Sequence, residues 1–403
     1  MQRIRGLNSH IAVGIDAIDA ESKAFDSVFA LNGGPVTTRW DVMSVWFGYH
    51  PECEPWGVLI YNQKVPVAAA VLSRRRRAGI WWISKPGEAD HQARLAAVSE
   101  DAALALAESI ADTIEGFGGP WTFSFPGLRN SNRVVAHLLS IWRHSEGREG
   151  VPVPYLACGP ADSLQSRVSR NTRNVVAKAR NRIERESIAL REQWTIEPEA
   201  IISRLPEIVR INRERNRQLR RRSPLDDPLA KSYYIDFLTA VVRYGRAELF
   251  TLELDDDLAA FAMCSRDAGE CWVLANLASP RWLRYSPGTI ANTEVVLHAL
   301  DDPECLGVNW GMGVQRYKLS GGATLLPRQD ILAWSSPALQ FLSQLHSTCA
   351  AVRWRKRPFP RSSRVAASAS SHGGQRRAAR LWFSRWSRSG GQAGSPDAVR
   401  NGG

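Results

Sequence analysis

Residues 270–300 read ECWVLANLASPRWLRYSPGTIANTEVVLHAL, and they predict a strand, a loop and a helix in direct succession. The strand is expected over Glu270–Ala278 and the helix from about Thr289 to Leu300. The first turn of a helix exposes free N–H groups and the positive end of the helix dipole, and a glycine there lets the backbone approach a phosphate. Gly288 stands at this position, so the stretch suits the pyrophosphate of a nucleotide-type cofactor. On spacing alone, the simpler interpretation is a tight turn in which Pro287 starts the helix.

The rest of the second half alternates helices and strands around this stretch. We expect helices over 162–186, 202–222 and 233–244, strands over 247–254, 258–265 and 307–310, one strand within 323–332, and a last helix that starts at Ser336-Pro337. The segment 162–186 is strongly basic. The turns at 255–257 and 267–269 are rich in Asp and Gly, which is typical of hairpins.

The first half shows the same loose plan of helix, hairpin, strand and helix. We expect helices over 40–49, 101–114 and 131–142, and strands over 56–61, 65–72, 80–83 and 121–125. Residues 1–30 are weakly patterned. The sequence therefore predicts a mixed α/β fold with two similar halves in tandem, over 31–157 and 158–357.

The basic character of the chain lies in its C-terminal tail. The whole sequence carries a net charge of +12, but residues 353–403 hold twelve Arg or Lys and one acid, which leaves the preceding residues near neutral. From residue 358 the composition turns to Ser, Gly and Arg, which predicts a disordered tail. Its RLWFSRW patch could touch an anionic surface or nucleic acid, and the alternative is a solvated tail without one fixed partner.

Composition also excludes several classes of protein. The 15 tryptophans and the 44% hydrophobic fraction allow a large core, whereas no apolar run reaches the roughly 20 residues of a membrane helix. The six scattered cysteines form no C-x-x-C pair and are expected to be reduced and structural. No cluster has metal-ligand spacing, and no G-x-S-x-G or Walker pattern appears. We expect a cytoplasmic protein without a metal, with a peripheral location at the inner membrane face as a further option.

A second stretch, VNWGMGVQRYKLSGG over 308–322, has four glycines around Trp310, Tyr317 and Lys318. A structural turn needs one or two glycines. The excess predicts either a glycine-rich loop without chemistry or a backbone that comes close to a ligand.

These features together resemble the GNAT acyltransferase superfamily, in particular its CelD-type branch, which is associated with polysaccharide and envelope biosynthesis. The resemblance is carried by Ser286-Pro287-Gly288, Asn309-Trp310-Gly311, Tyr317-Lys318 and the basic segment SRNTRNVVAKARNRIERE over 169–186. It covers residues 160–330 well and 40–157 loosely. The loop at Ser286-Pro287-Gly288 differs from the common superfamily pattern, Q/R-x-x-G-x-G/A, because it contains only one glycine, Gly288.

The resemblance implies a splayed sheet that grips the pantetheine arm of acetyl-CoA or another acyl-CoA between two parallel strands, 270–278 and 307–310. Backbone N–H groups of the first strand would polarise the thioester, and an amine or hydroxyl would attack directly. It implies the following roles: general acid for Tyr317, stabilisation of negative charge or binding of an anionic acceptor for Lys318, an acceptor-pocket wall for Trp310 and Gly311, and cofactor contacts for Asn276, Arg284, Ser286, Pro287, Gly288 and Thr289. The general base is not identified: Glu253, Glu270 and Glu294 are candidates by position only, and His298 is more simply structural.

Two other functions remain open at this point. One is a FemABX-like aminoacyltransferase, a group that resembles two GNAT units in tandem and takes its acyl group from aminoacyl-tRNA. The duplicated plan and the basic helices favour it, but no helical arm for tRNA is evident. The other is a non-catalytic protein that binds RNA or another anionic polymer. A small-molecule, sugar, lipid-linked or peptide acceptor is compatible with the sequence.

Overall fold

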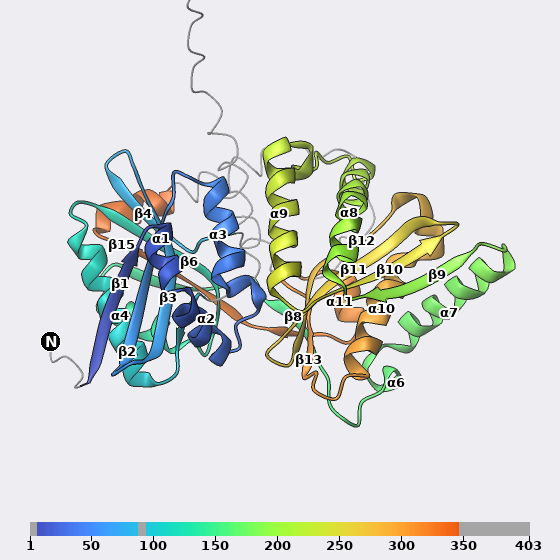
Figure 1. Cartoon of the computed structure of the whole chain (residues 1–403), viewed down its shortest axis with the longest axis horizontal. Helices are drawn as coiled ribbons and strands as arrows, with labels where there is room; N and C mark the ends of the chain where they lie inside the picture. The colour runs from blue at the N-terminus through green and yellow to red at the C-terminus, as the bar shows by residue number, and fades with distance from the viewer. Residues whose placement is uncertain (1–5, 88–93, 346–403) are drawn as a thin grey trace, which may run out of the picture. The chain divides into compact units, whose positions relative to one another are not determined.

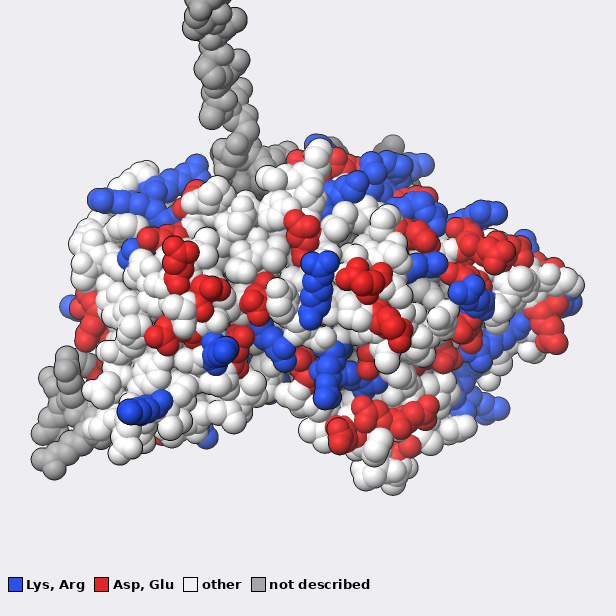
Figure 2. Space-filling model, in the orientation of Figure 1, with Lys and Arg blue, Asp and Glu red and all other residues white. Residues whose placement is uncertain are grey.

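The computed structural model describes residues 6–87 and 94–345, and it confirms the predicted mixed α/β fold with two sheets flanked by helices (Figure 1). The predicted tail over 358–403 and Cys349 lie outside the described residues. On the face shown in Figure 2, Lys and Arg are interspersed with Asp and Glu, as a nearly neutral body requires.

The first sheet has the strand order β1-β2-β3-β4-β6-β15-β7, and β5 pairs with β3. Its strands are β1 (Leu7–Val13), β2 (Glu54–Asn62), β3 (Val65–Arg77), β4 (Ile80–Ser84), β5 (Leu95–Ala97), β6 (Trp121–Arg129), β7 (Ser145–Glu149) and β15 (Arg328–Trp334). The helices of this part are α1 (Ile15–Ala20), α2 (Ser22–Leu31), α3 (Trp40–Tyr49), α4 (Glu100–Gly116) and α5 (Arg133–Ile141), with the 3-10 turn η1 (Val36–Thr38).

Helices α4 and α5 cover one face of this sheet with their apolar sides. The core includes Trp56 and Phe123 from the strands and Leu106 and Leu138 from the helices, all nearly or fully buried. Full burial of such side chains stabilises the fold by about 1.5–3 kcal/mol each. Strands β4 and β6 are parallel, from Trp81 opposite Trp121 to Ser84 opposite Ser124, and α4 connects them.

The second sheet has the strand order β14-β8-β13-β12-β11-β10-β9. Its strands are β8 (Val153–Ala157), β9 (Leu190–Thr195), β10 (Ala247–Leu254), β11 (Asp257–Asp267), β12 (Glu270–Ala278), β13 (Gly307–Asn309) and β14 (Thr324–Leu326). Its helices are α6 (Leu164–Arg167), α7 (Arg170–Arg185), α8 (Pro198–Gln218), α9 (Pro228–Tyr244), α10 (Pro287–Leu300) and α11 (Arg316–Ser320), with the 3-10 turns η2 (Pro224–Asp226) and η3 (Pro280–Tyr285).

The second sheet contributes to two hydrophobic clusters, each of which packs helices against its strands. One packs Val176 of α7 and Val295 of α10 against strand residues such as Phe250. The other packs Ile208 of α8 and Val241 of α9 against the strands and reaches Val42 of α3. Helix α3 therefore packs beside α9, and residues from both halves of the sequence share this second cluster.

The two sheets exchange strands. Strand β8 lies early in the sequence and pairs with β13 and β14, whereas β15 lies late in the sequence and pairs with β6 and β7 of the first sheet. The single strand predicted within 323–332 is thus two strands in different sheets. The predicted division of the chain at residue 157 stays a prediction.

Several further expectations need correction. The basic helix predicted over 162–186 is two helices, because Val168 and Ser169 are extended and Ser169 caps α7 by accepting from the Thr172 N–H. Residues 7–31, which looked weakly patterned, form β1, α1 and α2. One expectation is confirmed: the helix predicted to start at Ser336-Pro337 is present over 337–345, where the described part ends.

Three of the four glycines in 308–322 adopt backbone conformations that favour glycine. Gly311, Gly313 and Gly322 have φ values of 67°, 94° and 89°, which side chains rarely adopt. A Cβ at Gly322 would also overlap the carbonyl oxygen of Arg167, so the loop lies directly on the residues before α7. Gly321, with a φ of −81°, has no such requirement.

We therefore expect Gly322→Ala to lower the free energy of unfolding by about 2–4 kcal/mol, since it combines a strained φ with a backbone overlap. The neighbouring Gly321→Ala is the matched control and should change it by less than about 1 kcal/mol. Urea unfolding of both variants measures the difference, and equal effects would show that the close approach at Gly322 has no energetic weight.

Candidate active site between β12 and β13

Strands β12 and β13 run parallel for three residue pairs and then separate. The pairs are Glu270 with Gly307, Cys271 with Val308 and Trp272 with Asn309. On the opposite edge of β12 the pairing with β11 shifts by one residue, which leaves Leu274 as a bulge. From Leu274 onward β12 is only partly buried, in contrast to residues 271–273. The described part of the chain thus pairs no strand with β12 on the β13 side beyond Trp272, and backbone N–H groups there can meet a ligand.

The first turn of α10 offers a backbone donor near this opening. Pro287 has no N–H, and the N–H groups of Thr289 and Ile290 donate to the Ser286 carbonyl oxygen at 2.9 and 3.3 Å. Gly288 keeps an N–H for which the described residues provide no hydrogen-bond partner, and the first turn contains no acidic residue. Ser286 adopts the left-handed conformation (φ 50°), and a Cβ at Gly288 would lie 3.3 Å from that of Ala278. The turn is therefore packed closely on β12 and is open to an anion.

The equivalent helix of the first sheet is closed to an anion. Helix α4 also follows one strand of a parallel pair, but the Ser99 hydroxyl accepts from the Ala102 N–H at 3.2 Å. Glu100 and Asp101 add negative charge in its first turn. Of these two parallel pairs, only the one in the second sheet leads to a helix start that suits a phosphate.

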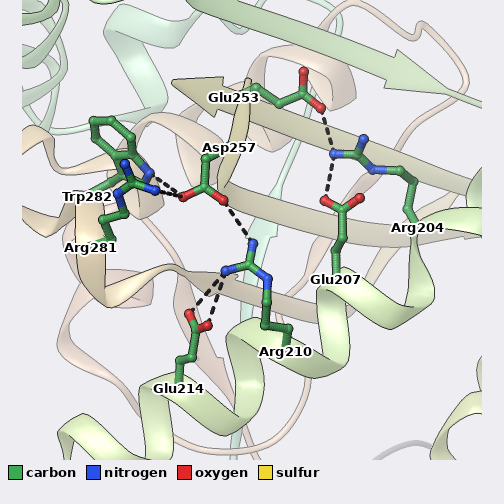
Figure 3. A network of polar contacts seen from close by, with 8 residues as sticks. All are labelled: Arg204, Glu207, Arg210, Glu214, Glu253, Asp257, Arg281 and Trp282. Atoms are coloured by element: carbon green, nitrogen blue, oxygen red, sulfur yellow. Dashed lines mark hydrogen bonds and ion pairs between the residues drawn. The ribbon is translucent and has the colours of Figure 1, made fainter. Parts of the chain in front are cut away.

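A polar network fixes η3, which leads into α10 (Figure 3). The Asp257 carboxylate accepts from the Trp282 indole at 2.8 Å, forms an ion pair with Arg281 at 3.4 Å and accepts from Arg210 of α8 at 3.0 Å. Nearby, Arg204 of α8 donates to Glu253 of β10 at 2.6 Å. The figure shows both arginines pointing from α8 toward the sheet. Helix α8 thus connects the strands β10 and β11 to η3, the segment before α10.

The other side of η3 is held by the end of α7. Arg182 donates to the Arg284 carbonyl oxygen at 2.8 Å, and the Tyr285 hydroxyl donates to Glu186 at 2.5 Å. The Arg284 guanidinium itself is bonded to Glu186 and to the Tyr285 hydroxyl. The predicted cofactor contact of Arg284 stays a prediction, and in this structure the side chain joins η3 to α7.

Asn276, Asn292 and Tyr317 converge at the opening. The Asn276 amide donates to the Asn292 side chain at 2.7 Å and to the Tyr317 hydroxyl at 3.2 Å. The Tyr317 ring stands edge-on to Trp310, with 6.4 Å between ring centroids. Tyr317 as a whole is 40% exposed, but burial around its phenol raises the pKa of Tyr317 above the usual value. The phenol therefore keeps its proton at neutral pH.

Lys318 points inward from the same helix. Its Nζ donates to the carbonyl oxygens of Trp310 at 2.6 Å and Met312 at 3.3 Å, and the residue is 5% exposed. Gly311 donates to the Asn309 side chain at 3.1 Å, which closes the turn after β13. Lys318 and Asn309 thus hold the glycine-rich loop, and the predicted chemical role of Lys318 remains a prediction.

The remaining predicted residues are distributed around the sheet. Trp310 is buried, and its indole N–H has no partner among the described residues. Glu253 forms an ion pair with Arg204, and Glu294 forms one with Arg180 at 2.7 Å. The His298 ring is hydrogen-bonded to Glu248 at 2.9 Å. Asn292 and Leu274 were missed, because an amide on a helix and one bulged strand residue leave no pattern in a single sequence.

The described residues contain no group of three or more His, Cys, Asp or Glu side chains that could hold a metal ion. Among the same residues, no helix is both long and apolar enough to cross a membrane. Five described cysteines are free thiols, as the sequence predicted.

The described sheet opens between the parallel strands β12 and β13, beside a helix start whose first turn has no acidic residue. Residues 170–319 match the family model described as an acetyltransferase (GNAT) domain. The match covers the opening between β12 and β13, the first turn of α10 and the loop with Tyr317. It leaves the CelD-type branch unresolved.

Two solved structures with TM-scores above 0.5 share the fold at low sequence identity. FemX is 9% identical with a TM-score of 0.57, over 80% of this chain and 97% of that one. A conserved protein of unknown function from Bacteroides thetaiotaomicron VPI-5482 is 11% identical with a TM-score of 0.52, over 78% of this chain and 96% of that one. A tandem GNAT protein from the clavulanic acid biosynthesis pathway is 14% identical over 82% of this chain and 99% of that one, with a TM-score of 0.44. No curated protein matches the sequence.

Proposed function

We propose that the chain transfers an acetyl or other acyl group from acyl-CoA to an amine or hydroxyl acceptor. The opening between β12 and β13, with the bulge at Leu274, carries this proposal. The pantetheine arm would enter this opening, and the pyrophosphate would meet the Gly288 N–H at the start of α10. The absence of acids from that first turn and the close packing of Gly288 on Ala278 support this fit.

The reaction would proceed by direct attack. The acceptor nitrogen or oxygen attacks the thioester carbon, and backbone N–H groups near Leu274 stabilise the oxyanion. The C–S bond then breaks, the acceptor loses a proton to solvent or a base, and Tyr317 gives its proton to the leaving thiolate. The hydrogen bonds between Tyr317 and Asn276 would hold the phenol in position.

The proposed branch of the superfamily and the proposed acceptor both follow from the resemblance in sequence. We propose a member of the CelD-type branch that works in the cytoplasm on a small-molecule, sugar or envelope-precursor acceptor. The two sheets, each with a parallel pair joined through a helix, support two GNAT-like halves in tandem, of which the C-terminal one binds the donor.

The alternative is a FemABX-like enzyme that takes its acyl group from aminoacyl-tRNA. The likeness in fold to FemX over most of both chains favours this alternative. A FemABX-like enzyme would bind the aminoacyl group in the same opening and would not need a phosphate contact at Gly288.

Thermal unfolding of the full chain with acetyl-CoA and longer acyl-CoAs separates the two functions. A CoA ester at about 100 times its Kd should add roughly 2.7 kcal/mol of stability. Gly288→Glu should abolish this gain by placing a carboxylate at the phosphate, whereas Gly288→Ala adds the same Cβ without charge and should retain most of it. If no CoA ester stabilises the folded chain, the CoA proposal fails and the aminoacyl-tRNA alternative takes its place.

Tyr317→Phe tests the general acid. We expect kcat to fall by about 10²-fold, with the KM for acyl-CoA unchanged, because the phenylalanine keeps the ring beside Trp310. Since burial raises the pKa of Tyr317, its deprotonation should lower the wild-type rate only above the usual phenol range, and Tyr317→Phe should lack that alkaline fall. Tyr61→Phe, in the first sheet, is the control. A Tyr317→Phe enzyme with wild-type kcat would remove the residue from the mechanism.

A further inference from the structure

Arg328, the first residue of β15, is a buried cation to which the described residues offer no hydrogen bond or ion pair. It is 7% exposed, and within residues 6–87 and 94–345 its guanidinium makes no hydrogen bond or ion pair. Its Nε is fully enclosed and unsatisfied. Burial of a charge is costly unless the charge is paired and hydrogen-bonded. The buried Arg94 is a contrast, because its guanidinium donates to the carbonyl oxygens of Pro86 and Thr37.

The surroundings of Arg328 increase this cost. Arg129 lies directly opposite across the β6–β15 pair, and like charges at such positions repel. The Glu270 carboxylate lies 3.6 Å from the Arg129 guanidinium and partly compensates its charge, and it also acts electrostatically on Arg328. Burial, and next the charge of Arg129, lower the pKa of Arg328 to about 10, so it stays charged at neutral pH. Two guanidinium groups thus share one carboxylate.

This cluster is connected to the candidate active site. Glu270 begins β12, four residues before the bulge at Leu274, which corresponds to about 13 Å along an extended strand. The Asn309 amide donates to Glu270 at 3.4 Å, and its carbonyl accepts from the Gly311 N–H at 3.1 Å. The side chains of Asn309 and Glu270 therefore link the glycine-rich loop to Arg129. Arg129 is 45% exposed and gives the cluster its solvent side.

We propose that Arg328 and Arg129 bind an anionic group, a carboxylate or a phosphate, of the acyl acceptor. The inference rests on the proposed transferase function and narrows the acceptor to one that carries such an anionic group in addition to its attacking amine or hydroxyl. Guanidinium groups bind both kinds of anion through paired N–H donors, and the donors of Arg328 make no hydrogen bond to the residues that the structure describes. The bound anion would complete the neutralisation that Glu270 begins.

The test is anion binding to the full chain in the absence of any CoA ester. The Tm is measured against concentration for inorganic phosphate and for acetate, at constant ionic strength. Phosphate also stabilises proteins by exclusion from their surface, so the informative quantity is the difference from Arg328→Gln. Arg148→Gln is the matched control, because Arg148 lies in β7 on the other side of β15 and is paired with Glu146 at 2.6 Å.

We expect a saturable rise in Tm for the wild type and for Arg148→Gln, and at least a tenfold weaker apparent Kd for Arg328→Gln, as loss of about one charge-assisted hydrogen bond predicts. Saturation by phosphate alone assigns a phosphate group, and saturation by acetate alone a carboxylate. If Arg328→Gln does not fold, the exposed Arg129→Gln serves, with the same loss expected. Equal curves for the wild type and these variants would overturn the proposal. Because no CoA ester is present, this result is independent of donor binding at Gly288.

Discussion

The candidate site depends on one constraint, the separation of two parallel strands after three residue pairs. The bulge at Leu274 bends β12 on one side of the gap, and the turn that Asn309 closes with Gly311 ends β13 on the other. Because the strands part inside the sheet, backbone donors that would otherwise be paired become available to a ligand. Every other proposed feature, from the start of α10 to Tyr317, is placed relative to this gap.

The two sheets show how one plan can carry different chemistry. Both contain a parallel pair joined through a helix, and they differ in the first turn of that helix. Ser99, Glu100 and Asp101 cap and charge α4, whereas α10 begins with Pro287 and Gly288 and has no acid. The first sheet instead contributes β15 and, with it, Arg328, while β8 joins the second sheet. This exchange brings Arg129 and Glu270 together from distant parts of the sequence.

Local patterns in the sequence were sufficient for the elements around the gap. The strand Glu270–Ala278, the helix after Gly288 and the strand at 307–310 were predicted because apolar runs, turn residues and helical spacing are encoded within about 15 residues. The parallel pairing of the two strands was implied by the GNAT resemblance. The GNAT resemblance agrees with the matched domain over 170–319. The strands β5, β7, β8 and β9 were missed, since each is short and is defined mainly by a distant partner.

The side chains were harder to predict than the backbone. Lys318 points to the carbonyl oxygens of its own loop, and Arg284 meets Glu186, which lies 98 residues away. Asn276 and Tyr317 are hydrogen-bonded to each other, and the contact of Asn276 with Asn292 was not foreseeable. Arg328 carried no local signal, because its burial without a partner among the described residues depends on how the sheets pack.

Hydrogen–deuterium exchange of the full chain, with and without saturating acetyl-CoA, tests the central claim most directly. If the donor binds in the gap, amides over 274–278 and the Gly288 amide should exchange more slowly, and the first turn of α4, over 100–103, should not change. Protection at α4, or none at either helix start, would contradict the assignment of the donor site to the gap between β12 and β13.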